Sequence, residues 1–283
     1  MRHQQTPAVV MKLTMLVSTL LFLGLTQGCV DLKAIHDFAN ISAESAEYTT
    51  LVDNYVDFPN RQKRYQPTER HAQLDTMAQE RQAQKSALLL RHAVIEEYME
   101  ALGNLASDEI VDQSEELSQL TSSLQNQAGT SPAETEAFGE MAGILTNAIS
   151  DNWRKRQLQQ LIERSNGPLQ TIITSLKKIM QDGFAGDDQN EQFAIQSYYR
   201  TKIAQSTDPA GIAALMEWQE QREQTVTEHA RAIQTYSIVL DEISAGHQKL
   251  YDERKDLSAG KLLAQIKQSG KKLQDLYATI KKL

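Results

Sequence analysis

The sequence has little of what most compact folds use to cross-link, turn or fill a chain. Its single cysteine, Cys29, excludes a disulfide within the chain. Two tryptophans, six prolines and thirteen glycines among 283 residues provide few large aromatic side chains and few turns. Good helix formers, such as glutamine, alanine and leucine, dominate instead. This composition argues against a β-sandwich or barrel and predicts an all-α protein with long helices.

Signatures of catalysis are also missing. The sequence contains no HExxH, GxSxG, P-loop or dinucleotide-binding motif. The five histidines after residue 28 fall in no short metal-ligand spacing; they are His36, His71, His92, His229 and His247. We therefore expect no enzymatic activity and no metal or other cofactor.

Acidic residues outnumber basic ones, but the excess is unevenly distributed. The formal net charge of −8 disfavours a nucleic-acid partner. Residues 255–283 reverse the sign, because seven lysines stand there against two acidic residues. Two explanations are open. The lysines suit a helix C-terminus beside acidic helices, or Lys267, Lys271 and Lys272 contact an anionic surface.

The segment from Met11 to Cys29 has the pattern of a secretory signal. Lys12 precedes an uncharged run at 13–28, which is largely apolar up to residue 25. These sixteen residues rise only about 24 Å as a helix, less than the ~30 Å hydrocarbon core of a bilayer. We therefore expect removal after export rather than a permanent span. Translation from Met11 would give a conventional signal by itself.

The end of this segment resembles the lipobox of bacterial lipoproteins. It reads Leu25-Thr26-Gln27-Gly28-Cys29, with the usual glycine before the cysteine and Thr26 where leucine is common. The resemblance, which covers only the first 29 residues, implies that Cys29 is acylated and that residues 1–28 are a signal peptide. Val30 follows, which in Gram-negative lipoproteins implies transfer to the outer membrane. The alternative is an ordinary signal peptide, or an artefact of the start site, with Cys29 as an unmodified thiol.

Apolar spacing divides the rest of the chain into two helical regions, at 29–166 and 167–283. In the first region we expect helices at 32–58, ending before Pro59, at 67–105 and at 108–124. The second of these helices would span roughly 57 Å, which predicts an elongated bundle.

A fourth helical stretch of this region is expected between two breaks, at 129–132 and at 166–168. Ser131 and Glu134 fit a capping box that starts a helix. Gly139 and Gly143, four residues apart, predict a tight contact with another helix. Asn166-Gly167-Pro168 predicts a stop.

The C-terminal region is predicted to end in an antiparallel coiled-coil hairpin. An acidic turn is expected at 182–191, and Asp208-Pro209 then starts the longest helix. A coiled-coil seam with alternating three- and four-residue spacing runs from Ile212 to Leu250, polar in its first half and apolar in its second, and a matching seam runs from Leu262 to Leu283 after a turn at 258–260. The predicted fold is an elongated antiparallel all-α bundle with long coiled-coil-like helices.

The first half of the long seam is polar at Gln219, Arg222 and His229. Polar residues in a helical seam often set the choice of partner. These three residues are either a docking site for a partner or a solvated part of the helix.

Together these features predict a lipid-anchored, non-enzymatic helical scaffold or binding protein of the bacterial cell envelope. We expect it at the outer membrane facing the periplasm, with another envelope protein as partner. The alternative is an exclusion or immunity lipoprotein that binds an incoming toxin, phage or conjugation component. A pore-forming protein or an enzyme is the third class.

Overall fold

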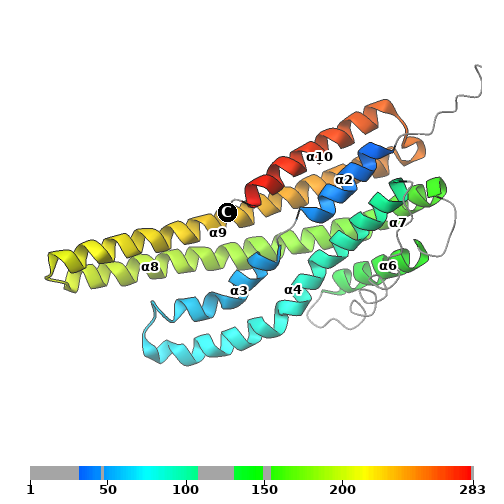
Figure 1. The fold of residues 1–283 in the computed structure, drawn as a ribbon. Helices are drawn as coiled ribbons and strands as arrows, with labels where there is room; N and C mark the ends of the chain where they lie inside the picture. The colour runs from blue at the N-terminus through cyan, green and yellow to red at the C-terminus, as the bar shows by residue number, and fades with distance from the viewer. Residues whose placement is uncertain (1–31, 46–47, 108–130, 149–153, 282–283) are drawn as a thin grey trace, which may run out of the picture.

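The computed structural model describes residues 32–45, 48–107, 131–148 and 154–281, and every element in these ranges is helical. The α-helices are α2 (Lys33–Glu44), α3 (Tyr48–Gln62), α4 (His71–Ala106), α6 (Pro132–Ala148), α7 (Arg154–Ile179), α8 (Ala185–Gln205), α9 (Pro209–Asp252) and α10 (Gly260–Ile280); shorter elements are η1 (Thr68–Arg70), η2 (Met180–Phe184) and η3 (Arg254–Asp256). They form an elongated antiparallel all-α bundle, as the sequence predicts (Figure 1). The helix expected at 108–124 and the lipobox lie outside the described residues.

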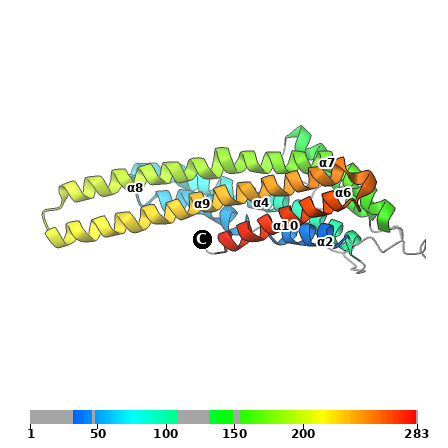
Figure 2. The same cartoon turned by 90° about the horizontal axis from the view of Figure 1, so that it is seen from above.

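Two long helical runs extend along the whole bundle. α7, η2 and α8 follow one another without interruption, and α9 returns beside them for 44 residues, or about 66 Å (Figure 2). The carboxylate of Asp208 caps α9, accepting hydrogen bonds from the backbone N–H groups of Ala210 at 3.2 Å and Gly211 at 2.9 Å. The predicted start of the longest helix is confirmed.

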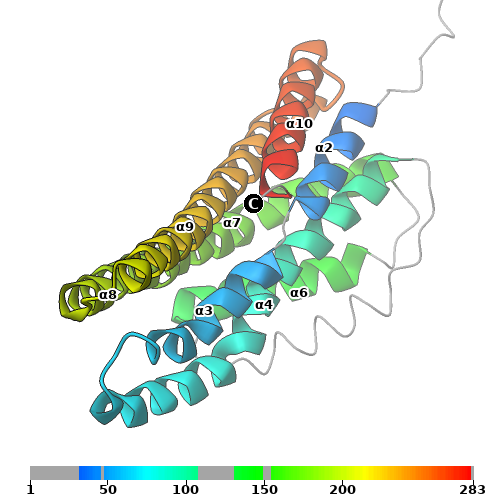
Figure 3. The same cartoon turned by 60° about the vertical axis from the view of Figure 1, so that its left-hand side comes forward.

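α10 folds back along α9 and also packs against α2 (Figure 3). Leu262, Ile266 and Leu273 are buried, as their spacing predicts. Gly246 of α9 allows α2 to approach closely, because a Cβ atom there would lie 2.5 Å from Cε2 of Phe38. The predicted α9–α10 hairpin therefore forms, with α2 packed against it.

Two prolines expected at helix ends lie inside helices, so these predicted stops are wrong. α3 continues past Pro59, and α7 passes through Pro168. The apolar face of α7 is buried on both sides of Pro168, by Leu158, Leu161 and Ile162 before it and by Leu169, Ile172 and Ile173 after it. Burial of this continuous face outweighs the hydrogen bond that proline removes. The boundary expected between residues 166 and 167 therefore lies within one helix.

Asn166, expected in a break, belongs to a buried hydrogen-bond network instead. Nδ1 of His247 donates to its Oδ1 at 2.9 Å, and Nε2 of the same ring accepts from the Tyr98 hydroxyl at 2.5 Å. The Tyr98 oxygen in turn accepts from Oγ of Ser165 at 2.7 Å. Burial lowers the pKa of His247 to about 3, so the ring is neutral at pH 7, as this network requires.

The start of α6 agrees with the sequence, but its packing does not. The capping box is present: the Ser131 N–H donates to Oε2 of Glu134 at 3.1 Å, and the Glu134 N–H donates to Oγ of Ser131 at 3.3 Å. Gly139 and Gly143 are exposed, and a Cβ atom on either would meet no atom of the described residues within 4 Å. The tight contact predicted at these glycines is wrong, because α6 buries another face: Ala137, Phe138, Met141, Ala142 and Leu145.

Candidate functional site

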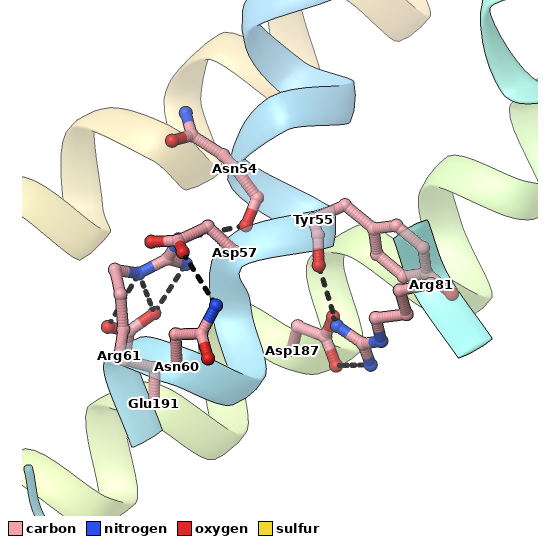
Figure 4. A network of polar contacts seen from close by, with 8 residues as sticks. All are labelled: Asn54, Tyr55, Asp57, Asn60, Arg61, Arg81, Asp187 and Glu191. Atoms are coloured by element: carbon pink, nitrogen blue, oxygen red, sulfur yellow. Dashed lines mark hydrogen bonds and ion pairs between the residues drawn. The ribbon is translucent and has the colours of Figure 1, made fainter. Parts of the chain in front are cut away.

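A dense polar cluster lies where α3 passes Pro59. Proline has no N–H to donate to the Tyr55 carbonyl four residues earlier. Arg81 of α4 supplies a donor instead, and its Nη1 lies 2.8 Å from that carbonyl oxygen (Figure 4). Nη1 of Arg61 likewise donates to the Asn54 carbonyl at 2.8 Å. α3 therefore continues past the proline with both carbonyls satisfied by arginine.

Both arginines also pair with carboxylates of α8. Arg81 binds Asp187 through both terminal nitrogens, with Nη2 2.9 Å from Oδ1, and each side chain is 11% exposed. Arg61 binds Glu191 through Nε and Nη2, at 3.0 and 2.8 Å. The two acids are four residues apart, on one face of a helix. The acidic turn predicted at 182–191 is wrong, because η2 and α8 make this segment helical throughout and its carboxylates pair with arginines of other helices.

The π-helical turn η2 precedes these carboxylates. A π-helical turn holds more residues than an α-helical one, so it changes which side chains of the following helix face a neighbour. Phe184, the last residue of η2, is buried and stacks on Tyr55 with ring centroids 4.6 Å apart. The Arg81 guanidinium lies over the same tyrosine ring, 4.2 Å from its centroid. Stacking and ion pairing together hold α3, α4 and α8 against one another.

Asp188 is buried in this cluster and forms no ion pair with a described residue, although the nearby Arg61, which pairs with Glu191, partly offsets its charge. Asp188 is 6% exposed, and its Oδ2 has no hydrogen-bond partner in the described part of the chain. Burial first, and then the nearby Glu191 carboxylate, raises the pKa of Asp188 to about 7. Asp188, Arg61 and His229 line a cavity of about 10 Å³, which has room for one water. Burial lowers the pKa of His229, so this ring is neutral at pH 7 and does not offset the carboxylate.

We expect Asp188→Asn to stabilise the protein above pH 7. The folded state holds a proton on this carboxyl that the unfolded chain releases near its ordinary value of 3.8. The stability that the protonated Asp188 carboxyl contributes is therefore complete below about pH 4 and is lost as pH rises through 7. The gain in free energy of unfolding should grow from near zero at pH 4 to about 2 kcal/mol at pH 8, measured by urea unfolding.

The matched control for this prediction is Asp182→Asn, a change of the same type in η2. Asp182 is exposed and paired with Lys178. Its replacement should change stability by less than about 0.5 kcal/mol at either pH. An equal gain from Asp188→Asn at pH 4 and pH 8 would contradict a buried, protonated carboxyl.

The three residues predicted to meet a partner do not form one site. Gln219 and Arg222 lie in the hairpin tip, residues 193–222, which extends beyond the other helices at one end of the bundle (Figure 1). Arg222 is exposed, whereas Gln219 is half-buried and donates to Oε1 of Glu223 at 2.7 Å. His229 lies instead at the small buried cavity.

The hairpin tip also exposes large apolar side chains. Phe193, Met216 and Trp218 are 69%, 57% and 54% exposed, and they make up three of the four large apolar residues exposed in the described ranges. Where the tip meets the rest of the bundle, Ile195, Tyr199 and Val226 form a second small core, against which Tyr65 packs. The seam does not reveal these exposed residues, because Trp218 and Met216 lie outside it.

The three lysines predicted to contact an anionic surface are all exposed on α10, but in two settings. Lys272 pairs with Glu242 of α9 at 2.6 Å. Lys267 and Lys271 form no ion pair with another described residue, and both line a groove between α2 and α10. Pairing with an acidic neighbouring helix therefore explains Lys272 and leaves the other two charges unmatched.

In the described ranges, no group of three or more histidine, cysteine, aspartate or glutamate side chains could hold a metal ion. Across the same ranges, no helix combines the length and apolar character needed to cross a bilayer. Comparisons with protein-family models, curated proteins and solved structures find no match to this chain.

Proposed function

We propose that this protein is a lipid-anchored, non-enzymatic helical scaffold or binding protein of the bacterial cell envelope. Cys29 would carry the lipid and hold the protein at the outer membrane, facing the periplasm. One observation carries the proposal: α2, which follows Cys29 closely in sequence, begins at one end of the bundle, and the hairpin tip lies at the other (Figures 1 and 2).

This arrangement separates attachment from recognition. α9 runs for about 66 Å, from its start within the hairpin tip to the turn that leads into α10. An acyl chain on Cys29 would restrain only the end at which α2 begins. The hairpin tip would remain accessible to a second protein.

The side chains of the hairpin tip suit a protein partner. Tryptophan is enriched among the residues that dominate binding energy at protein interfaces, and methionine and phenylalanine are enriched in interfaces generally. Trp218, Met216 and Phe193 remain exposed in the isolated chain, although their burial would be favourable. Arg222 adds an exposed guanidinium that could bind a carboxylate of the partner.

Photo-crosslinking in living cells, combined with palmitate labelling, tests this proposal. We expect palmitate on the wild-type chain and none on Cys29→Ser. A crosslinker in place of Trp218 should give a discrete adduct, reduced about tenfold by Cys29→Ser because the anchor sets the local concentration. The control position is Glu253, exposed at the opposite end of α9.

The palmitate label tests the anchor, and the crosslinked adduct tests recognition by the hairpin tip. Undiminished palmitate on Cys29→Ser would contradict acylation at this residue. The same adduct from positions 218 and 253 would contradict recognition by the hairpin tip. The identity of the adduct distinguishes a resident envelope protein from the incoming toxin or phage component of an immunity lipoprotein.

A further inference from the structure

A groove lies between α2 and α10, beginning at the first residue of α2. Its volume is about 560 Å³, in the usual range for small-molecule sites. Ala34 of α2 and Leu263 and Ala264 of α10 provide its apolar surface, and Phe38 of α2 lies at its bottom. Phe38 is completely buried, so the bottom of the groove is continuous with the core.

The groove carries a positive charge in an otherwise acidic protein. Lys33, Lys267 and Lys271 line it. Lys33 pairs with Asp37 at 2.7 Å, so these two charges offset each other. Lys267 and Lys271 are one helical turn apart, and no ion pair with a described residue neutralises either of them. Two neighbouring ammonium groups beside an apolar surface match an amphiphile with an anionic head.

The sequence puts this groove close to the proposed lipid anchor. Lys33 is four residues after Cys29. Consecutive Cα atoms are 3.8 Å apart, so the two residues lie within about 15 Å whatever the path between them. A bilayer that holds an acyl chain of Cys29 therefore lies within reach of Lys33.

We propose that the α2–α10 groove binds an anionic phospholipid of that membrane. The lipid phosphate lies on Lys267 and Lys271, and an acyl chain lies along Ala34, Leu263 and Ala264. This inference rests on the proposed acylation of Cys29, which brings the bilayer to the groove. A small soluble anion would leave the apolar surface uncovered, whereas a zwitterionic lipid would leave the two lysines without a net counter-charge.

Binding of short-chain lipids to the full chain in detergent tests the proposal. Native mass spectrometry or calorimetry should show dioctanoyl phosphatidylglycerol bound at least about tenfold more tightly than dioctanoyl phosphatidylcholine or glycerol phosphate. Lys267→Gln with Lys271→Gln should weaken phosphatidylglycerol binding about tenfold or more. Ala264→Glu, which adds an acid at an exposed position of the groove, should do the same.

The matched control pair is Lys255→Gln with Lys261→Gln, which removes the same charge from exposed positions outside the groove. This pair should leave affinity within about twofold. An equal loss of affinity in the control pair would mean that only the overall charge matters. Equal binding of phosphatidylcholine would mean that the groove does not recognise the anionic headgroup. Equal binding of glycerol phosphate would mean that it does not recognise the acyl chain. Any of these results overturns the proposal.

The same assay on Cys29→Ser separates this inference from the proposed function. Equal affinity with and without the cysteine supports a groove for membrane phospholipid. Binding only by Cys29→Ser would assign the groove to the protein's own acyl chain and overturn the proposal. Absence of lipid binding by a chain that still incorporates palmitate would reject the groove and leave the anchor in place.

Discussion

Arg81→Met is expected to lower the free energy of unfolding by about 3–5 kcal/mol, a large part of the stability of a typical domain. Methionine retains an apolar side chain beside Tyr55 but cannot donate a hydrogen bond. Asp187 would become an unpaired buried carboxylate, and the Tyr55 carbonyl beside Pro59 would lose its donor. Urea unfolding followed by circular dichroism measures the loss.

Two further variants decide whether the loss comes from these contacts. Lys85→Met removes a neighbouring charge of α4, but Lys85 and Asp53 are 34% and 51% exposed, so it should cost less than about 1 kcal/mol. In a Pro59→Ala background a backbone N–H becomes available to the Tyr55 carbonyl, and Arg81→Met should cost about 1 kcal/mol less. Equal losses for Arg81→Met and Lys85→Met would contradict a buried ion pair.

Helix starts could be predicted from this sequence because their determinants are local. Asp208 caps backbone groups two and three residues later, and Ser131 and Glu134 satisfy each other within one turn. The fold class was equally accessible, since composition and spacing alone favour long helices.

The candidate site could not be predicted, because its partners are distant in the sequence. Arg81 binds a carbonyl 26 residues away and a carboxylate 106 residues away, and Arg61 binds Glu191 across 130 residues. From the neighbouring residues alone, Pro59 predicts the end of a helix and the acidic stretch at 182–191 predicts a turn. The four-residue spacing of Asp187 and Glu191 was the one available signal for a shared helix face.

Surface charges were predictable as a group but not one by one. The lysine-rich end of the chain was evident from composition, yet only the packing of α10 beside α9 shows that Lys272 is occupied by Glu242. The exposure of Trp218 and Met216 likewise follows from the hairpin tip, which extends past the other helices. The spacing of apolar residues identifies the buried face of a helix. It does not identify the part of the opposite face that another helix covers.

Leu273→Ala is expected to cost about 2–5 kcal/mol and to lower the melting temperature by roughly 5–15 °C. Leu273 is completely buried in the main core, on a helix that packs against both α2 and α9. Truncation leaves a cavity that surrounding helices can fill only in part. Thermal unfolding measured by circular dichroism gives the shift.

The control lies on the opposite face of the same helix. Lys267→Gln with Lys271→Gln changes two exposed residues and should alter stability by less than about 0.5 kcal/mol. If this pair unfolds the protein and Leu273→Ala does not, the buried face of α10 has been assigned to the wrong side. If the order is as expected, the lysine variant is a folded protein, and any loss of phospholipid binding by it reports on the groove rather than on stability.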